Sequence, residues 1–117
     1  MSNDAGPLIV FSTVDDAASA RRLADGLVGA GLAACVNILP PVTSVFRWEA
    51  ETADSSHAAV QAEEEVMMLI KTSAAAYPAL EELLRAEHPY ELPEIVAVPV
   101  ARGLPAFLRW IDEAARA

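Results

Sequence analysis

Residues 88–94 concentrate polar chemistry in one short segment of this 117-residue chain. The segment, His-Pro-Tyr-Glu-Leu-Pro-Glu, combines an imidazole, a phenol, two carboxylates and two prolines. Because each proline fixes its own φ angle and favours an extended residue before it, we expect a stiff connector with defined side-chain directions. Such a connector can bind a ligand or a metal ion, or it can be a proline-pinned turn whose carboxylates face water.

The single cysteine, Cys35, is the other residue with distinctive chemistry. It lies in the apolar run 32–37, Leu-Ala-Ala-Cys-Val-Asn, and one cysteine excludes an intrachain disulfide, which suits a reducing compartment. Free cysteine is among the most buried residue types, so we interpret Cys35 first as a buried, inert thiol and second as a metal ligand.

An acidic stretch follows, with no lysine or arginine between Arg47 and Lys71. We expect residues 52–62 to form the tip of an extended hairpin. The nearby carboxylates and His57 could gather a hard cation, but a solvated charge run is the preferred interpretation because mobile loops rarely hold six oxygen ligands in place. The carboxylates are those of Glu49, Glu51, Asp54, Glu63, Glu64 and Glu65.

Composition narrows the possible partners. The 8 basic and 17 acidic residues give a net charge of −9, which disfavours nucleic acid and anionic membrane surfaces. No run approaches the roughly 20 apolar residues of a membrane helix, and residues 1–6 lack signal-peptide features, so we expect a cytoplasmic protein. A hydrophobic share of 54% predicts that part of the apolar surface faces another copy of the chain.

Hydrophobic periodicity predicts the elements that position these residues. Strands are expected at 8–12, at 66–71 and at 95–100, where Pro99 should lie at an edge, a bulge or a strand end. A longer strand should cover 32–51 and bend at Pro40-Pro41.

Three helices are expected between and after these strands. The first follows a capping box outlined by Thr13 and Asp16 and stops at Gly29 and Gly31. The second starts near Tyr77 and Pro78 and ends before Pro89, and the third starts at Pro105 with Phe107, Leu108 and Ile111 on one face and Trp110 packed beside them.

The predicted order is β-α-β-β-α-β with a C-terminal helix. This order favours an α+β, ferredoxin-like split βαβ fold, with a four-stranded antiparallel sheet and both crossover helices on one face. We expect a flexible N-terminus at 1–7 and one domain at 8–117. Because the second sheet face is apolar and uncovered, a sheet-mediated homo-oligomer is predicted.

Four blocks resemble, in order and spacing, the CutA family of divalent-cation tolerance proteins. They are 32–37, 44–49 (Ser-Val-Phe-Arg-Trp-Glu), 69–72 (Leu-Ile-Lys-Thr) and 88–94, and the resemblance runs from Leu8 to about Ala114. It implies a homotrimer shaped like the PII signalling proteins, with three sheets around a central core and a link to tolerance of copper and other divalent cations.

The resemblance also implies candidate sites. Copper-binding members carry a thiol at the place of Ser12 and a histidine pair at 87–88, so the implied ligands here are His88, Glu87 and Cys35, holding Cu(II) or another divalent cation with modest affinity. The residues that resemble the inter-subunit cleft of the family are Trp48, Lys71, Tyr90, Glu91 and Glu94.

Two functions therefore stay open. One is a metal-responsive binding protein. The alternative is a PII-like signalling or scaffold trimer that holds a small ligand or protein partner in its clefts, unless Trp48 and Tyr90 simply fill the interface. An enzyme is not expected, because the sequence has no Gly-rich phosphate loop, no Cys-x-x-Cys pair and no His-Glu-x-x-His helix.

Overall fold

The elements of the chain follow the predicted order. The structure, a computed structural model, describes residues 6–48 and 59–116. The elements are β1 (Pro7–Val14), α1 (Ala17–Gly29), β2 (Cys35–Ile38), β3 (Val42–Trp48), β4 (Ala59–Ser73), α2 (Tyr77–Glu87), β5 (Val96–Pro99) and α3 (Pro105–Ala114). Within these ranges no helix is long and apolar enough to cross a membrane.

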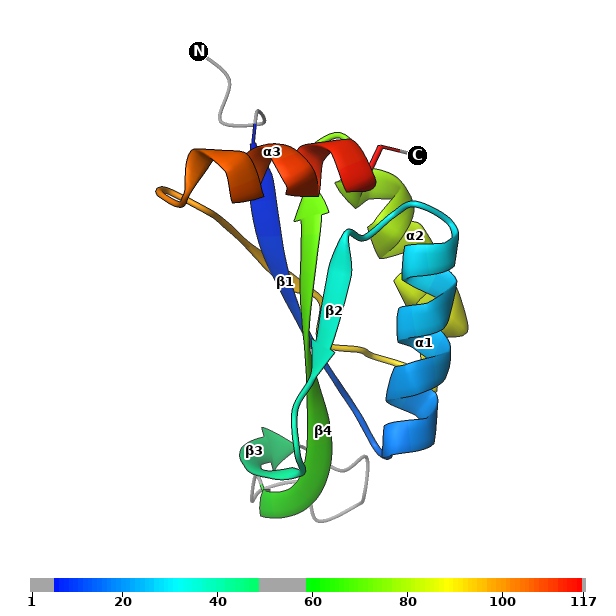
Figure 1. Cartoon of the computed structure of the whole chain (residues 1–117). Coiled ribbons are helices and arrows are strands. Elements are labelled where there is room, and N and C mark those ends of the chain that lie inside the picture. The colour runs from blue at the N-terminus through cyan, green and yellow to red at the C-terminus, as the bar shows by residue number, and fades with distance from the viewer. Residues whose placement is uncertain (1–5, 49–58, 117) are drawn as a thin grey trace.

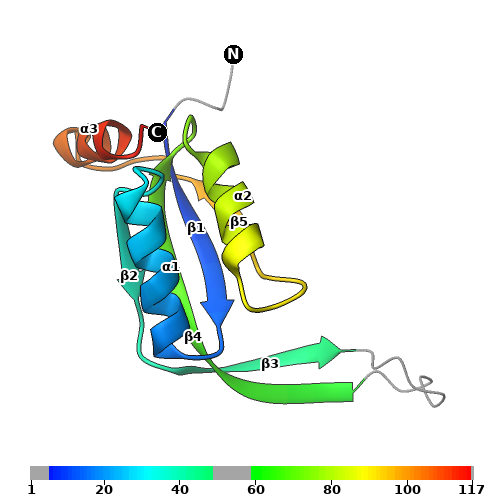
Figure 2. The same cartoon turned by 90° about the vertical axis from the view of Figure 1, so that its right-hand side faces the viewer.

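The sheet has the predicted ferredoxin-like topology. Strands β1 and β4 are central, β2 lies beyond β4 and β5 lies beyond β1, and every pairing is antiparallel. Helices α1 and α2 cover one face of the sheet (Figure 2). Pro99 is the last residue of the edge strand β5, as its missing N–H group predicts.

The expected single strand over 32–51 is instead two strands, so the sheet has five strands rather than four. Both β2 and β3 pair with β4. After β2, the Leu39 N–H still donates a backbone hydrogen bond to the Met67 carbonyl of β4 over 2.9 Å. The ladder breaks at Pro40-Pro41 because proline has no N–H to donate.

Strand β4 is longer than predicted and belongs to two parts of the molecule. Its residues 66–73 pair with β1 in the body, whereas 59–65 pair with β3 (Val42–Trp48) in a two-stranded arm. The arm projects away from the body at the end opposite α3 (Figures 1 and 2). Of the predicted hairpin tip, 59–62 belong to β4, and 52–58 lie outside the described residues, as do Glu49 and Glu51.

Two predicted boundaries near the N-terminus are wrong. Thr13 does not cap α1, because its backbone continues the β1–β4 ladder opposite Met67. Asp16 is the cap, and its Oδ1 accepts the Ser19 N–H over 2.7 Å. Pro7 already belongs to β1, and the rest of the expected flexible N-terminus, except Gly6, lies outside the described residues.

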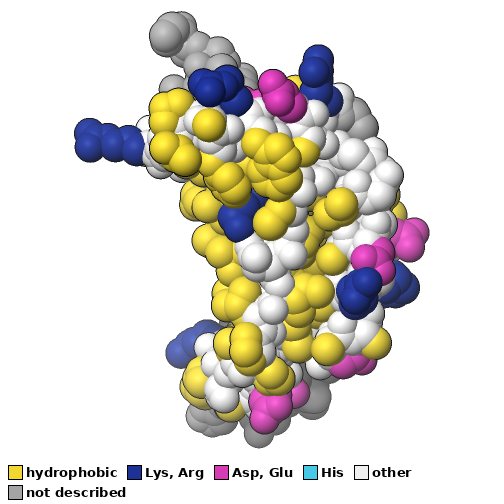
Figure 3. All heavy atoms as spheres, in the orientation of Figure 1, with side chains coloured by type: hydrophobic (Ala, Val, Ile, Leu, Met, Phe, Trp, Pro, Cys, Tyr) yellow, Lys and Arg dark blue, Asp and Glu magenta, His cyan; other side chains and the backbone are white. Residues whose placement is uncertain are grey.

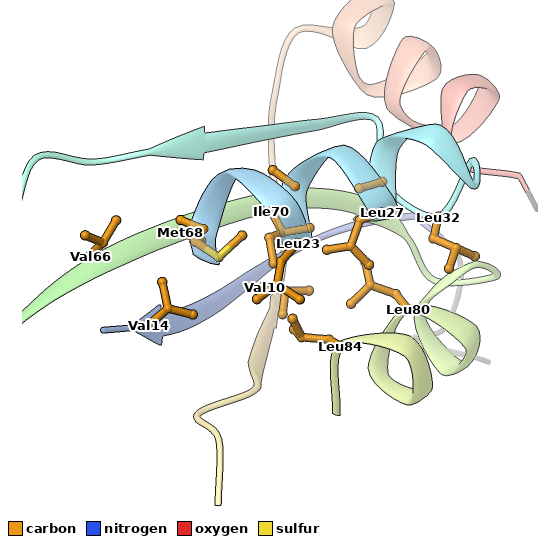
Figure 4. Packing of buried hydrophobic residues seen from close by; sticks show 13 residues of the cluster. Val10, Val14, Leu23, Leu27, Leu32, Val66, Met68, Ile70, Leu80 and Leu84 are labelled. Carbon is orange, nitrogen blue, oxygen red and sulfur yellow. The ribbon is translucent and has the colours of Figure 1, made fainter. Parts of the chain in front are cut away.

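The core lies between the sheet and the two helices (Figure 4). Even-numbered residues of β1 and β4 point toward α1 and α2, since side chains alternate along a strand. The buried set includes Val10, Val14, Val66, Met68 and Ile70 from the strands and Leu23, Leu27, Leu80 and Leu84 from the helices.

Odd-numbered residues of β1 and β4 point away from α1 and α2, into what we call the open face. Val96 and Val98 of β5 share this face and remain 53% and 42% exposed. Its other members include Ile9, Phe11, Cys35, Asn37, Leu69 and Lys71.

Helix α3 lies across one end of the sheet (Figure 1). Ile111 is buried beneath it, and Trp110 lies beside Phe107 with ring centroids 5.4 Å apart. Trp110 therefore lies beside Phe107 as predicted, but both aromatic rings are exposed rather than part of the core.

Candidate functional site

A groove of about 1180 Å³ runs between the arm and the segment 90–94. Four of the five predicted cleft residues line it, namely Trp48 on the arm and Tyr90, Glu91 and Glu94 on the segment. The groove is therefore the place where four of the predicted cleft residues lie together within the chain.

Strand alternation sets the floor of this groove. Ser44 and Phe46 of β3 lie opposite Glu63 and Gln61 of β4, and Glu65 lies two residues further along the same side. Trp48, at the end of β3, is 49% exposed. An aromatic surface beside carboxylates suits a cationic group better than an anionic one.

Negative charge dominates the groove. Arg47 is the single basic residue among the lining residues, against six carboxylates. Such a lining raises the local concentration of cations and repels anions. The carboxylates belong to Asp15, Glu63, Glu64, Glu65, Glu91 and Glu94.

Tyr90 is the residue that ties the segment to the arm. Its hydroxyl donates to Glu65 Oε2 over 2.7 Å. Burial raises the pKa of the Tyr90 phenol strongly, and the hydrogen bond to Glu65 and the negative charges of Glu65, Asp15 and Glu63 raise it further. The phenol therefore stays protonated and serves as a donor, not as an oxyanion ligand.

His88 is buried at 8% exposure and uses both ring nitrogens. The Tyr90 N–H donates to Nδ1 over 3.0 Å, so Nδ1 carries no proton, and Nε2 must then donate to the Thr13 carbonyl 2.9 Å away. Burial lowers the pKa of His88, although the bond to Thr13 and the charges of Asp15 and Glu65 oppose that change. The imidazole is therefore neutral, and each of its two ring nitrogens makes a hydrogen bond.

Glu87 lies on the surface and pairs with α1. Its Oε1 lies 3.8 Å from Arg22 Nη1, and the Arg22 guanidinium also donates to the Glu87 carbonyl at 3.4 Å. These contacts join the end of α2 to α1. Because they are exposed, they contribute little to stability.

Cys35 is partly exposed on the open face, so its interpretation as a buried thiol is wrong. The thiol lies beside a charged group. Lys71 of β4 is directly opposite Cys35, and Lys71 Nζ is 3.7 Å from Cys35 Sγ. Lys71 Nζ also donates to Asn37 Oδ1.

Lys71 does not line the groove with the other predicted cleft residues. It lies six residues from Glu65 along β4, which is about 20 Å at the usual rise of a strand. Across residues 6–48 and 59–116, no cluster of three or more histidine, cysteine or carboxylate side chains is arranged to hold a metal ion. The three implied metal ligands are therefore not assembled within the described part of the chain.

Sequence reasoning missed three residues that matter here. Glu65 was grouped with a solvated charge run, although it binds Tyr90, and its spacing of two from Glu63 was a signal that both share one strand face. The same spacing relates Asn37 to Cys35. Asp15 follows β1 directly and gave no comparable signal.

Comparison with known proteins identifies relatives over nearly the whole chain. The model of the family described as "CutA1 divalent ion tolerance protein" matches residues 8–114. The divalent-cation tolerance protein CutA of Thermus thermophilus is 42% identical over 105 residues, covering 90% of this chain and 94% of that protein. Protein CutA of Mus musculus is 38% identical and covers 88% of this chain, but the chain spans only 54% of that relative.

A solved structure has the same fold. The crystal structure of CutA1 from the psychrotrophic bacterium Shewanella sp. SIB1 matches with a TM-score of 0.85 at 37% identity, covering 97% of this chain and 98% of that one. Similarity in sequence and in structure therefore extends over the body, the arm and the segment 88–94. This chain belongs to the CutA1 divalent ion tolerance protein family.

Proposed function

We propose that this chain works as a homotrimer in the response to divalent cations and binds Cu(II) or another divalent ion weakly and conditionally. The observation that carries the assembly is the uncovered apolar side of the sheet, where Val96 and Val98 stay 53% and 42% exposed. Family membership supports the link to divalent cations, and the number three comes from the resemblance to PII-like trimers. A cytoplasmic location and the absence of catalysis stay predictions.

The uncovered apolar surface is continuous enough to form an interface. In Figure 3 hydrophobic side chains gather in a band that runs from α3 along the sheet. The exposed rings of Phe107 and Trp110 on α3 add aromatic surface. Exposed apolar patches of this kind are typical of interfaces between copies, because their burial removes apolar area from water.

Sedimentation velocity at micromolar concentration tests the assembly. Val98→Lys places a charge on the open face and should convert the trimer to slower-sedimenting protomers. Val28→Lys is the matched control, because Val28 is also 42% exposed but lies on α1. A wild-type chain that sediments as a folded protomer would contradict the assembly.

Metal binding is conditional because the implied ligands are engaged elsewhere. His88 uses both ring nitrogens, Glu87 contacts Arg22, and Cys35 lies on the open face. A complete site therefore needs a rearrangement or ligands from another copy. Calorimetric titration of Cu(II) into the metal-free wild-type protein and into His88→Ala tests whether His88 is a ligand. Identical isotherms would exclude His88 as a ligand.

The groove favours the alternative function, a trimer that holds a small ligand or a protein partner. Its support is the meeting of Trp48, Tyr90, Glu91 and Glu94 in one acidic groove. A thermal-shift screen should show stabilisation by cationic ligands and none by nucleotides or carboxylates. If no ligand shifts the melting temperature, Trp48 and Tyr90 are better explained as residues of the subunit interface.

A further inference from the structure

We propose that the groove of one copy receives the segment 101–110 of the next copy, so that the arm end of each chain meets the α3 end of its neighbour. This inference rests on the proposed homotrimer and deepens it, because it names the two unlike surfaces that form each contact between copies. It follows from the charge, the exposure and the position of these two surfaces.

The segment 101–110 combines positive charge with uncovered apolar side chains. It contains Arg102 and Arg109 and no carboxylate. Leu104, the residue before α3, is 72% exposed, and the rings of Phe107 and Trp110 are exposed as well. In Figure 3 basic side chains flank the hydrophobic surface at the α3 end of the molecule. Exposed aromatic rings beside arginines are typical of protein interfaces.

The two arginines of this segment are not paired within the chain. Arg21, Arg22 and Arg85 each lie beside a carboxylate of their own chain. Arg102 and Arg109 are exposed and form no ion pair with any residue that the structure describes. Their guanidinium groups are therefore available to carboxylates of another copy.

The groove offers the complementary surface. Its lining holds six carboxylates against one basic residue, Arg47. Apolar area comes from Phe46 and Trp48 on the arm and from Leu92, which is 74% exposed, on the opposite wall. An arginine side chain suits this lining, because its guanidinium can bind a carboxylate and also stack on an aromatic ring. The groove and the segment 101–110 therefore match in charge, and each leaves apolar side chains that contact would cover.

The two surfaces lie at opposite ends of the chain, so they can meet only between copies (Figures 1 and 2). Both adjoin the open face. The hydrophobic band of Figure 3 joins it to α3, and at the other end Thr13, Glu63 and Glu65 of the groove lining are odd-numbered residues of β1 and β4. A contact between unlike surfaces repeats head to tail and can close into a ring. A ring of three copies joined in this way would enclose their open faces.

Thiol crosslinking tests which surfaces meet. Cys35→Ser removes the only native thiol, and in that background Leu92→Cys places a thiol on the groove wall and Leu104→Cys places one before α3. The two leucines are matched in exposure. A short bismaleimide at micromolar protein concentration links thiols that lie close together, and denaturing gel electrophoresis separates the products by size.

We expect the chain that carries both new cysteines to give covalent trimers, because each thiol meets the unlike thiol of the next copy. Chains with Leu92→Cys alone and with Leu104→Cys alone should each stay uncrosslinked, and their co-expressed mixture should give covalent dimers. The chain with Leu92→Cys and Val28→Cys is the control and should stay uncrosslinked, because Val28 is exposed on α1, outside both surfaces.

Charge reversal tests the arginines by sedimentation velocity. The double variant Arg102→Glu, Arg109→Glu should weaken assembly about tenfold, since it sets negative charge against the acidic groove. The double variant Arg21→Glu, Arg85→Glu changes the net charge equally but lies on α1 and α2, so it should assemble like wild type. Equal assembly by the two double variants would contradict a role for Arg102 and Arg109.

The outcomes separate this inference from the homotrimer itself. Trimers that give no crosslink between Leu92→Cys and Leu104→Cys would mean that another occupant fills the groove, which overturns the inference while the homotrimer stands. Crosslinks formed by either single variant alone would show that like surfaces meet and would overturn it too. A wild-type chain that sediments as a folded single copy would remove both the homotrimer and this inference.

Discussion

Cys35 and Lys71, the only cysteine and the only lysine of the chain, face each other across β2 and β4 with Sγ and Nζ 3.7 Å apart. Both lie on the open face, which the proposed trimer covers. The chain thus carries a single thiol on the surface where assembly is expected.

Thiol labelling should therefore report assembly. We expect Cys35 to react slowly with an aromatic disulfide reagent in the wild-type trimer and rapidly in Val98→Lys, because the variant exposes the open face. Val28→Lys should react as slowly as wild type. Equal rates in all three proteins would place Cys35 outside the subunit interface.

The bond between Tyr90 and Glu65 should be measurable as a coupling energy. Tyr90→Phe and Glu65→Ala should each lower the free energy of unfolding by about 1 kcal/mol, and the double variant should lose less than their sum. Glu64→Ala is the control, since Glu64 also lines the groove but the Tyr90 hydroxyl donates to Glu65, so this variant should change stability by less than about 0.5 kcal/mol. Strict additivity would contradict the bond.

Stability should depend on pH through His88. Because burial lowers the pKa of His88 in the folded chain below the ordinary value of 6.5, the unfolded chain binds more protons just below that pH. The stabilisation is fully present above pH 6.5 and is lost as pH falls from 6.5 toward the folded pKa, with a slope of at most about 1.4 kcal/mol per pH unit. Urea unfolding of wild type and His88→Gln between pH 5 and 7.5 measures this pH dependence of the free energy of unfolding. Matching profiles would show that His88 does not cause the pH dependence.

Two buried serines should respond in opposite directions. Ser12 is fully buried, and its Oγ has no hydrogen-bond partner among the residues that the structure describes, so Ser12→Ala should raise the free energy of unfolding by about 1 kcal/mol. Ser73 Oγ donates to the Ala115 carbonyl over 2.6 Å and accepts the Ala76 N–H over 3.0 Å. Ser73→Ala should therefore lower the free energy of unfolding by about 1 to 2 kcal/mol. Thermal unfolding of both variants beside wild type measures the two changes.

Periodicity was sufficient to predict the element order, because the apolar residues of α1, α2 and the central strands repeat as their packing requires. It did not place the helix start at Asp16 or separate β2 from β3. Those boundaries depend on how far the pairing with β4 extends, and pairing between distant segments leaves no local signal.

The residues that line the groove could be predicted only in part. Tyr90, Glu91 and Glu94 share one short segment and so lie together, and Trp48 joins them through the family resemblance; all four line the groove, and its role as an inter-subunit cleft stays a prediction. Lys71 was grouped with them for the same reason, but the length of β4 places it away from the groove. The engagement of both His88 nitrogens could not be predicted, because the Thr13 carbonyl comes from a strand 75 residues away in sequence.

Because β4 runs without interruption from the arm into the body, the two parts share one alternation of side chains. An insertion of one residue between Glu65 and Val66 would invert the arm, so that the inserted residue took the place of Glu65 and the Glu65 side chain faced away from Tyr90. An insertion of two residues would keep each side chain of the arm on its present side of the strand and would only move the arm further from the body. Length variation at this junction should therefore be tolerated in even steps and selected against in odd ones.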